Sequence, residues 1–458
     1  MKYTLTLTAV QRARLLPHLF PPDGNEAVAF LLCGRHAGEE RTRLLVHKVE
    51  LLPHELCKVR EPDRVTWPTN WLVPLLNEAA KKQLSVIKIH GHVGYDQFSN
   101  VDNHSDRELF PSVHAWVGDD IPHGSAILMD DGRVFGRMVD DEGRFHPFDS
   151  VNLVGPDLVY WREADDEYEV PESGRRVAQV FGDKTFALLR GLRVAVIGCS
   201  GTGSPVIEQL VRNHIGGLVL VDPDHIEEKN LNRIWNSTAA DAAAETLKVE
   251  VAERTIKAIG FGTKVKVFRQ TLFDKEVVRA IADCDVVVGC MDTVDGRWLL
   301  NKLATFYLLP YFDLGVRIDA DGKGGVKQVA GSVHYLQPGS GSLLSRKVLT
   351  LEQVRAAGMQ RTNPEEYKRQ LKEGYVKGAA VDRPAVIQLN TLIASLAVDD
   401  LLARLHPYRL DGNDDSVIRV SLSHNIFQRE ADGVACAVLT KHVGRGDVHP
   451  LLDSPELS

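Results

Sequence analysis

The chain has 458 residues, of which 44% are hydrophobic and 25% are charged, and its net charge is −8. This is the profile of a globular protein with two or three domains, and the negative charge gives no reason to expect nucleic acid or an anionic membrane as a partner. The N-terminus lacks the apolar core of a signal peptide, and no stretch approaches the ~20 apolar residues that span a bilayer. Six scattered cysteines form no CxxC pair. They favour a reducing compartment, so we expect a cytoplasmic protein.

An acidic run, EADDEYEVPE at 163–172, separates two parts of different character. With few aliphatic side chains it is typical of a linker or a solvated loop, and a charged helix face is the alternative. Before it we expect a compact α+β domain over residues 1–160. Its strands are expected near 27–32, 43–49 and 84–89, its helix near 71–82, and, after a polar loop, β-rich sequence to about 154. The linker is expected over 161–174 and a second domain over 175–458.

The second part alternates strands with helices. Short β-branched runs at 194–197, 218–221, 265–268 and 286–288 are separated by helical patterns. Strands without polar alternation are typical of a parallel sheet that helices cover on both faces. The sequence therefore predicts a doubly wound, mostly parallel α/β sheet.

A glycine-rich loop, GCSGTGS, follows the first of these strands and precedes a helix. Its candidate ligand-binding residues are Gly198, Gly201, Thr202, Gly203 and Ser204. Glycines let the backbone turn sharply beside a phosphate, and the helix N-terminus presents free N–H groups. Asp222 ends the next strand, where a carboxylate can accept hydrogen bonds from a ribose. These features indicate a nucleotide site, but a tight turn without ligand is the alternative, and a dinucleotide dehydrogenase would share them.

Three later features separate ATP chemistry from hydride transfer. The segment NLNR supplies the amide of Asn230 and the guanidinium of Arg233, which suit a triphosphate. Lys248 adds a point charge for the same phosphates. Asp292 lies just beyond a strand end, where a carboxylate beside a triphosphate is a natural magnesium ligand. A dehydrogenase would also need G-x-G-x-x-G, whereas this chain has G-x-x-G-x-G.

Residues from about 176 to 409 resemble the ThiF/HesA/MoeB family, which includes the catalytic core of ubiquitin-activating enzymes. The motifs that carry the resemblance are GCSGTGS at 198–204, VDPD at 221–224, NLNR at 230–233, Lys248, and CMDTVDGRWLLN at 290–301. The resemblance implies ATP and Mg²⁺ as cofactors. The residues it implies are Asp222 for the ribose, Asn230, Arg233 and Lys248 for the phosphates, and Asp292 for the magnesium ion, with Asp224 of the VDPD motif as a further cofactor-binding residue. It also implies attack of a C-terminal glycine carboxylate on the ATP α-phosphate, with release of pyrophosphate.

The resemblance also implies partners. The substrate would be a ubiquitin-like protein, a separate conjugating enzyme would be a further partner, and the domain would form a homodimer. Family members carry an arginine in an R-x-x-R-Q setting that reaches the neighbouring subunit's site. Here the stretch reads RRVAQ, so Ala178 replaces the second arginine unless Arg175 or Arg176 takes its role. Two surface arginines are the alternative.

Many relatives pass the acyl group to a cysteine in a crossover loop and hold a structural zinc with two CxxC pairs. Residues 338–381 contain no cysteine, and Ser342 and Ser345 replace one pair, so we expect no structural zinc. The remaining thiol, Cys436, has two interpretations. It is a small buried hydrophobe, or it is a thioester-forming nucleophile activated by Lys441 and His442.

The first part carries a second constellation. An apolar strand ends in His90 and His92, which point to the same side of an extended chain. Ser99 and Asp102 follow in the next loop, and Glu26 opens an earlier strand. Two imidazoles and a carboxylate leave one position for water, which is the arrangement of a catalytic zinc site.

Residues 1–155 resemble the JAMM (JAB/MPN) metalloprotease domain, which removes ubiquitin-like proteins or trims their tails. The resemblance implies a Zn²⁺ site with Glu26 as general base, Ser99 as oxyanion-stabilising donor, and His90, His92 and Asp102 as ligands. Val93 stands where proline is usual, and the serine–aspartate pair is one residue closer to the histidines than is common. A degenerate domain that only recognises a ubiquitin-like partner is the alternative.

Together these observations predict a two-domain enzyme of a bacterial ubiquitin-like conjugation pathway. Its JAMM-like domain would process or bind the same ubiquitin-like protein that the second domain adenylates. One alternative is adenylation that feeds sulfur transfer for cofactor synthesis or a peptide modification. Another is a non-catalytic adaptor, although intact Arg233, Lys248 and Asp292 argue against it.

Overall fold

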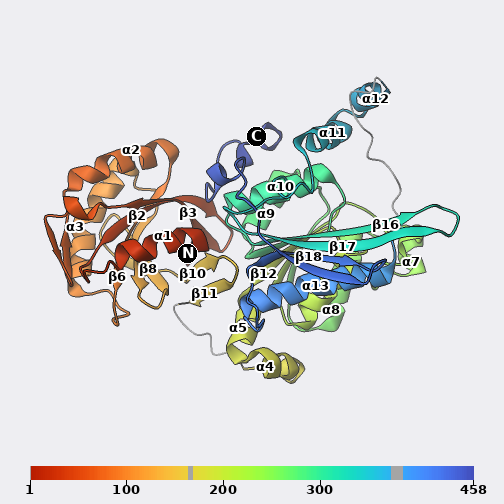
Figure 1. The fold of residues 1–458 in the computed structure, drawn as a ribbon, viewed down its shortest axis with the longest axis horizontal. Coiled ribbons are helices and arrows are strands. Elements are labelled where there is room, and N and C mark those ends of the chain that lie inside the picture. The colour runs from red at the N-terminus through yellow and green to blue at the C-terminus, as the bar shows by residue number, and fades with distance from the viewer. Residues whose placement is uncertain (1, 163–168, 373–384) are drawn as a thin grey trace. The chain divides into compact units, whose positions relative to one another are not determined.

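The structure is a computed structural model that describes residues 2–162, 169–372 and 385–458 (Figure 1). The chain folds into two compact units. The first comprises residues 1–165, 306–308 and 442–453, and the second comprises residues 166–305, 309–441 and 454–458. Most of the acidic run lies outside the described residues, so the linker at 161–174 stays a prediction, as do the domain boundaries. The structure adds that a C-terminal segment expected in the second domain belongs to the first unit.

The first unit is a mixed β-sheet with helices on its faces. Its strands are β1 (Lys2–Thr8), β2 (Val28–Ala37), β3 (Arg41–Leu51), β4 (Val59–Glu61), β5 (Arg64–Thr66), β6 (Ser85–His92), β7 (His123–Met129), β8 (Val134–Val139), β9 (Phe145–Pro147), β10 (Ser150–Val154) and β11 (Leu158–Arg162). Its helices are α1 (Ala9–Leu19), α2 (Val73–Lys82) and α3 (Asn100–Val117). The nine-stranded sheet has the order β11-β10-β1-β3-β2-β6-β7-β8-β9, and β4 and β5 form a separate hairpin. The expected strands are confirmed as β2, β3 and β6, and the expected helix is confirmed as α2.

Both faces of this sheet are buried, as the alternation along β2 shows. Ala29 and Leu31 pack in one cluster with Leu15 and Leu19 of α1. Phe30 and its alternate neighbours pack in a second cluster with α2 and α3. A strand that contributes to two cores loses its polar alternation, which explains the continuous apolar run in its sequence.

One expectation for the first unit is wrong, because residues 100–117 form α3 where β-rich sequence was expected. Ser99 caps the helix, since its hydroxyl accepts a hydrogen bond from the backbone N–H of Asp102. The buried side chains Phe110, Val113 and Val117 recur at helical spacing on one face. Many polar residues and an internal proline obscure that stripe in the sequence.

Residues 442–453 pack closely on β2 and β3 within the first unit. The N–H of Gly34 donates to the carbonyl of Gly444 (3.1 Å), and the N–H of Asp447 donates to the carbonyl of Arg35 (2.6 Å). A Cβ on Gly34 would lie 2.3 Å from the Gly444 oxygen, so only glycine allows this approach. The Asp447 carboxylate also accepts from the Tyr307 hydroxyl (2.9 Å). The segment is therefore part of this unit's fold.

The second unit is a layered α/β structure. Its strands are β12 (Arg193–Ile197), β13 (Gly217–Val221), β14 (Lys264–Phe268), β15 (Val286–Gly289), β16 (Tyr311–Ala320), β17 (Val326–Leu336), β18 (Asp415–Ser421) and β19 (Ile426–Ala431). Its helices are α4 (Arg175–Phe181), α5 (Asp183–Gly191), α6 (Gly203–Arg212), α7 (Ala239–Ala243), α8 (Lys248–Ile259), α9 (Lys275–Ala282), α10 (Val294–Phe306), α11 (Leu351–Thr362), α12 (Pro364–Lys372) and α13 (Ile387–Leu405). No described helix is long and apolar enough to cross a bilayer.

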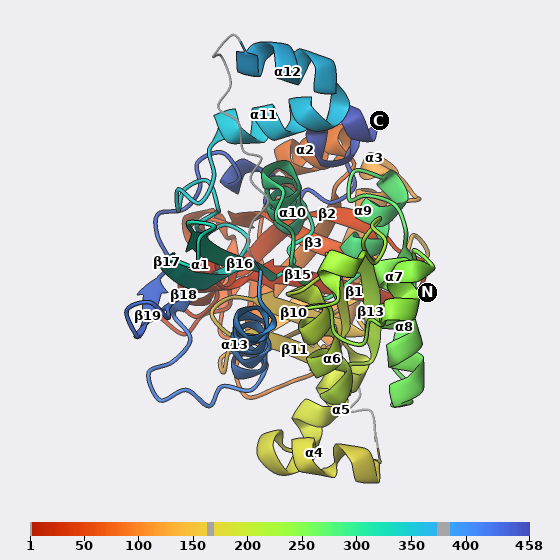
Figure 2. The ribbon, with the colours of Figure 1, turned by 90° about the vertical axis from the view of Figure 1, so that its right-hand side faces the viewer.

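The strand order of the second unit creates a crevice at the centre of its sheet. The order is β14-β13-β12-β15-β16-β17-β18-β19, and the first five strands pair in parallel, as expected. Helices α9 and α10 cover one face, and α8 and α13 cover the other (Figure 1). Figure 2 shows α6 and α13 beside one another on that second face. The chain leaves β12 toward β13 but later returns to its other side as β15, so the loops after β12 and β15 diverge at a switch point.

Candidate functional site

The glycine-rich loop lies at this switch point and is tightly closed. Gly198 has φ +94°, and its N–H donates to the carbonyl of Val221 (2.8 Å). A Cβ on Gly203 would lie 1.8 Å from the Gly198 carbonyl oxygen, so no side chain fits there. Because α6 begins at Gly203 and Thr202 immediately precedes it, the helix N-terminus opens at the carboxyl end of β12. A helix N-terminus in this position favours an anionic group.

Asp222 and Lys248 are held next to the loop. One carboxylate oxygen of Asp222 accepts from the N–H of Cys199 (2.7 Å), and the other accepts from the N–H of Asp224 (2.9 Å). The Lys248 ammonium donates to Asp224 (2.8 Å) and lies 4.0 Å from Asp222. Burial raises the pKa of Asp222, and the Lys248 charge opposes this rise. The structure therefore brings these three predicted residues together at the crevice.

Arg233 also reaches the loop, but Asn230 has a local partner. A Cβ on Gly201 would lie 3.0 Å from Cδ of Arg233, whose guanidinium donates to the carbonyl of Lys229 (2.8 Å). The side-chain oxygen of buried Asn230 accepts from the N–H of Glu227 (3.1 Å) and caps a short turn. Ser204 likewise accepts from the N–H of Trp235 (3.0 Å) through its hydroxyl. The NLNR side chains thus bond locally, and the backbone N–H of Trp235, just after the segment, ties it to the loop.

Sequence reasoning missed Asn390, which lies on α13. Its side-chain nitrogen would be 2.3 Å from a Cβ on Gly201, and the residue is buried. Asn390 is distant from every motif in the sequence, and an asparagine in an apolar helix is the only signal that it gives. The structure places its amide against the phosphate-loop candidate.

Asp292 follows β15 on the other side of the switch point. It is exposed, and it comes two residues after Cys290, whose carbonyl oxygen would lie 2.8 Å from a Cβ on Gly198. Five residues further on, Arg297 forms an ion pair with the buried Asp313, whose carboxylate also accepts from the Tyr311 hydroxyl (2.8 Å). Arg297 lies within the CMDTVDGRWLLN motif, yet sequence reasoning assigned it no role. The pair anchors the start of α10 directly after Asp292.

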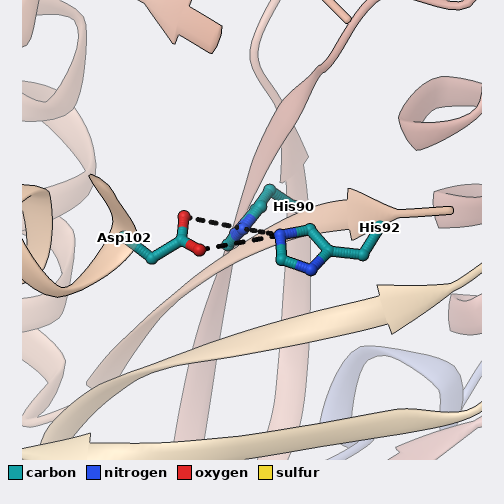
Figure 3. Close-up of side chains that lie close together, drawn as sticks. All are labelled: His90, His92 and Asp102. Atoms are coloured by element: carbon teal, nitrogen blue, oxygen red, sulfur yellow. Dashed lines mark hydrogen bonds and ion pairs between the residues drawn. The ribbon is translucent and has the colours of Figure 1, made fainter. Parts of the chain in front are cut away.

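In the first unit, the structure gathers His90, His92 and Asp102 as one cluster (Figure 3). Their ligand atoms all lie within 4.8 Å of one another. Nε2 of His90 is 3.0 Å from Nε2 of His92 and 3.0 Å from Oδ1 of Asp102. Nε2 of His92 is 3.6 Å from Oδ2 of Asp102. Ligand atoms around a tetrahedral zinc ion lie about 3.3 Å apart, so these residues fit the ion that the JAMM resemblance implies.

The protonation states of the cluster suit a metal. Burial lowers the pKa of His90, which favours the neutral imidazole that binds cations. Burial alone would raise the pKa of Asp102, but hydrogen bonds and charge from His90, with hydrogen bonds from Ser99, lower it overall. The other ring nitrogen of His92 contacts the carbonyl of Tyr95 (3.0 Å), which orients the imidazole.

Ser99 and Glu26 flank this cluster. The Ser99 hydroxyl donates to the Asp102 carboxylate (2.7 Å), and its N–H donates to the same oxygen (2.7 Å). This capping box shows that Ser99 orients Asp102, a role that the sequence did not indicate. Glu26 lies 3.9 Å from Nε2 of His90, and burial raises its pKa to about 7, with Asp102 adding to the rise.

A buried charge network that sequence reasoning missed supports α3 behind Asp102. Lys88 of β6 forms an ion pair with Asp106, and Arg137 of β8 donates to the same carboxylate (2.7 Å). The Ser125 hydroxyl also donates to Asp106 (2.5 Å). Lys88 was visible as a single charge in an apolar strand, but its partners come from distant segments. The network fixes the first two turns of α3, and with them Asp102.

The metal cluster opens into a cavity of about 1030 Å³ that also contains Glu26, Ser99 and Lys88. Both apolar and polar side chains from α2, α3 and the β4–β5 hairpin line the rest of it, with Leu76, Val113 and Trp116 among the apolar ones and Arg64 and Glu108 among the charged ones. A cavity of this size and composition is typical of a ligand site. The sequence identified its polar end and did not indicate its apolar walls.

Cys436 is buried, with 2% of its surface exposed, and its N–H donates to the carbonyl of Ser340 (3.0 Å). Ser342 and Ser345 bond each other's backbone N–H groups through their hydroxyls (3.1 and 2.9 Å). The burial favours the interpretation of Cys436 as a packed hydrophobe. Its role as a nucleophile stays a prediction.

The candidate intersubunit arginines lie at the start of α4. Arg175 pairs with Glu172 (3.0 Å), and Arg176 donates to Gln179 (3.1 Å), both on the surface. The predicted homodimer and the role of either arginine stay predictions.

Comparisons with known proteins find relatives of part of this chain. The chain resembles ubiquitin-like modifier-activating enzyme 5 of Drosophila pseudoobscura pseudoobscura, with 29% identity over 168 residues, covering 34% of this chain and 40% of the relative. It also resembles the adenylyltransferase and sulfurtransferase UBA4 of Meyerozyma guilliermondii, with 29% identity over 136 residues, covering 29% and 31%. The chain thus spans less than half the length of these relatives.

A crystal structure of E. coli MccB with ATP is 19% identical and covers 59% of this chain and 74% of its own, with a TM-score of 0.42. The ThiF family model matches residues 174–431, which is more than half of the 458 residues. The chain therefore belongs to the ThiF family.

Proposed function

We propose that the second unit is an ATP-dependent adenylating enzyme that activates the C-terminal carboxylate of a ubiquitin-like protein. The observation that carries the proposal is the placement of Asp222, Asp224 and Lys248 beside a tight loop in which Gly203 leaves no room for a side chain. The family implies ATP and Mg²⁺, and an ammonium with two carboxylates at a helix N-terminus suits both.

The roles follow from the positions of the side chains. The helix α6 N-terminus and Gly203 receive phosphate oxygens, and Asp222 accepts from the ribose. Lys248 leaves Asp224 and neutralises the triphosphate, which lowers the cost of attack by a second anion. Asp292 would hold Mg²⁺, which when bound neutralises charge on the pyrophosphate leaving group.

The acyl-adenylate is proposed to pass to a nucleophile outside this chain. All six cysteines lie in the described residues, and each is buried or half-buried. A thiol must be accessible and deprotonated to attack. The adenylate could therefore serve conjugation, sulfur transfer or peptide modification, since all three begin with the same adenylate.

The test is carboxylate-dependent ATP–pyrophosphate exchange with a small protein that ends in glycine. Lys248→Ala is expected to lower exchange by about 100-fold, because a charge that meets the triphosphate is lost. Lys257→Ala is the matched control, since Lys257 lies on the same helix and pairs with Glu253 on the surface. Equal exchange in both variants would refute the assignment.

We further propose that the first unit is a JAMM-like zinc hydrolase that acts on the same ubiquitin-like protein. The cluster of His90, His92 and Asp102 would hold Zn²⁺, which when bound activates water at neutral pH. Glu26 is placed to accept a proton beside it, and Ser99 orients Asp102. Metal analysis tests the proposal, since wild-type protein should bind one zinc ion per chain and His90→Ala should bind none.

A further inference from the structure

We infer that the cavity beside His90, His92 and Asp102 contains an apolar subsite for a bulky side chain that adjoins the scissile bond. This inference rests on the proposed hydrolase function of the first unit. It specifies the substrate as a chain with a large aliphatic or aromatic residue next to the cleaved bond, rather than a tail of glycines alone.

The floor of the subsite consists of core residues that still line the cavity. Val28, Leu72, Leu76 and Val113 are between 1% and 6% exposed, and all four border it. They belong to the cluster between the sheet, α2 and α3. Their side chains therefore present a firm apolar surface to the cavity, since residues packed on their other sides hold them in place.

Two tryptophans form the walls. Trp67 follows β5 and packs edge-on against Phe30 with a ring-centroid separation of 6.0 Å. Trp116 of α3 is 47% exposed, and its indole N–H donates to Asn77 of α2 (3.0 Å). An exposed tryptophan with a fixed ring is typical of a surface that buries an apolar partner.

The polar end of the same cavity identifies the occupant as substrate. Glu26, the histidines and Asp102 border the cavity together with the apolar walls. The backbone N–H of Glu26 donates to the carbonyl of Glu61 (2.9 Å), so the candidate base is tied to the β4–β5 hairpin that borders the subsite. A chain whose carbonyl lies at the histidines therefore has its neighbouring side chain at the apolar floor.

The volume supports the same conclusion. A cavity of about 1030 Å³ is much larger than an extended chain of glycines needs at the histidines. If water occupied the apolar part of the cavity, that surface would stay hydrated, whereas a leucine or phenylalanine that covers part of it would gain about 10- to 100-fold in affinity over glycine.

The experiment measures peptide binding by calorimetry with zinc-loaded Glu26→Gln protein, so that binding is observed without turnover. The probes are acetyl-Gly-Gly-X-Gly-Gly-amide peptides with X as Gly, Leu, Phe or Glu. Leu and Phe are expected to bind about 10- to 100-fold more tightly than Gly, and Glu no more tightly than Gly. Trp116→Ala should reduce the Leu preference at least about threefold, because a wall of the subsite is lost.

The control is Leu56→Ala in the same background, since Leu56 is 43% exposed in the same unit and does not border the cavity. Circular dichroism confirms that each variant is folded. Equal affinity of all four peptides, no binding by any of them, or equal effects of Trp116→Ala and Leu56→Ala would overturn the inference. Wild-type protein is then mixed with the same peptides and analysed by mass spectrometry. Tighter binding of the Leu and Phe peptides without cleavage would refute the proposed hydrolase activity but support the apolar subsite. Cleavage of all peptides without such a preference would support the hydrolase activity but refute the subsite.

Discussion

The two candidate sites differ in how their functional groups are held. In the first unit, His90, His92 and Asp102 point at one another, and Ser99 and a buried ion-pair network fix them (Figure 3). In the second unit, the cationic groups contact carboxylates or the backbone. Lys248 contacts Asp224, and the Arg233 guanidinium contacts the carbonyl of Lys229.

This difference reflects the ligands that the sites are proposed to take. A small cation needs ligand atoms at fixed separations, so the fold must set them before binding. A triphosphate brings several charges of its own and can displace internal partners. Before ATP binds, Asp222 and Asp224 provide the counter-charge that the buried Lys248 ammonium needs. The proposed metal site is therefore expected to be prearranged, whereas the nucleotide site is expected to rearrange on binding.

Glu26→Gln is expected to have the largest effect, and it tests whether the metal ligands are positioned independently of the base. If the metal site is prearranged, removing the base should lower zinc-dependent hydrolysis by about 10³-fold and leave zinc binding unchanged. Amide and carboxylate have nearly the same shape, and Glu26 is not one of the three clustered ligands. Hydrolysis rate and zinc content of the purified variant are the two measurements. Loss of zinc would instead make Glu26 part of the metal-binding set.

Asp292→Ala should lower ATP–pyrophosphate exchange by about 100-fold, because the proposed magnesium ligand is lost. Asp292 is exposed, so its removal should leave the urea midpoint of unfolding unchanged. Asp321→Ala, which removes another carboxylate of the same unit from a hairpin turn, is the control. Full exchange activity in the Asp292 variant would rule out the magnesium role.

The two units also differ in how much of their structure the sequence predicted. The parallel strands and the Gly198 loop were predictable, because buried β-branched runs and a glycine-rich turn are local signals. Helix α3 was not, since its apolar stripe is interrupted by polar residues and Pro111. Asp102 was nevertheless identified, because its spacing from His92 is short.

Supporting residues were harder to predict than ligands. Asp106 meets Lys88 and Arg137 only because three separate elements pack together. Asn390 reaches Gly201 from a helix almost at the other end of the second unit's sequence. Contacts of this kind depend on tertiary packing, and no local pattern records them. For Cys436 the sequence left two interpretations open. The residue is buried and its backbone N–H donates to the carbonyl of Ser340, which favours packing, and the nucleophile role stays a prediction.

Asp106→Asn tests whether the buried charges position the proposed metal ligands. Lys88 and Arg137 would lose their shared counter-charge, so α3 should shift and zinc affinity should fall by about 10- to 100-fold. Competition with a chelator of known zinc affinity measures the change. Asp131→Asn is the control, because Asp131 pairs with Arg133 on the surface. Equal zinc affinity in both variants would show that Asp106 serves stability only.

Cys436→Ala should have the smallest effect and tests how the adenylate is used. Its thiol is 2% exposed and lies where the 432–440 segment meets Ser340, so it cannot receive an acyl group without local opening. We expect exchange within about twofold of wild type and a loss of stability of about 1 kcal/mol, the cost of a small cavity. No thiol-sensitive conjugate should form on the wild-type chain during turnover, and non-reducing gels test this directly. A conjugate that appears with wild type and vanishes with Cys436→Ala would show that the segment opens. In that case the backbone of the second unit would move during turnover, in addition to its ion pairs. The contrast with the proposed prearranged metal site would then be larger.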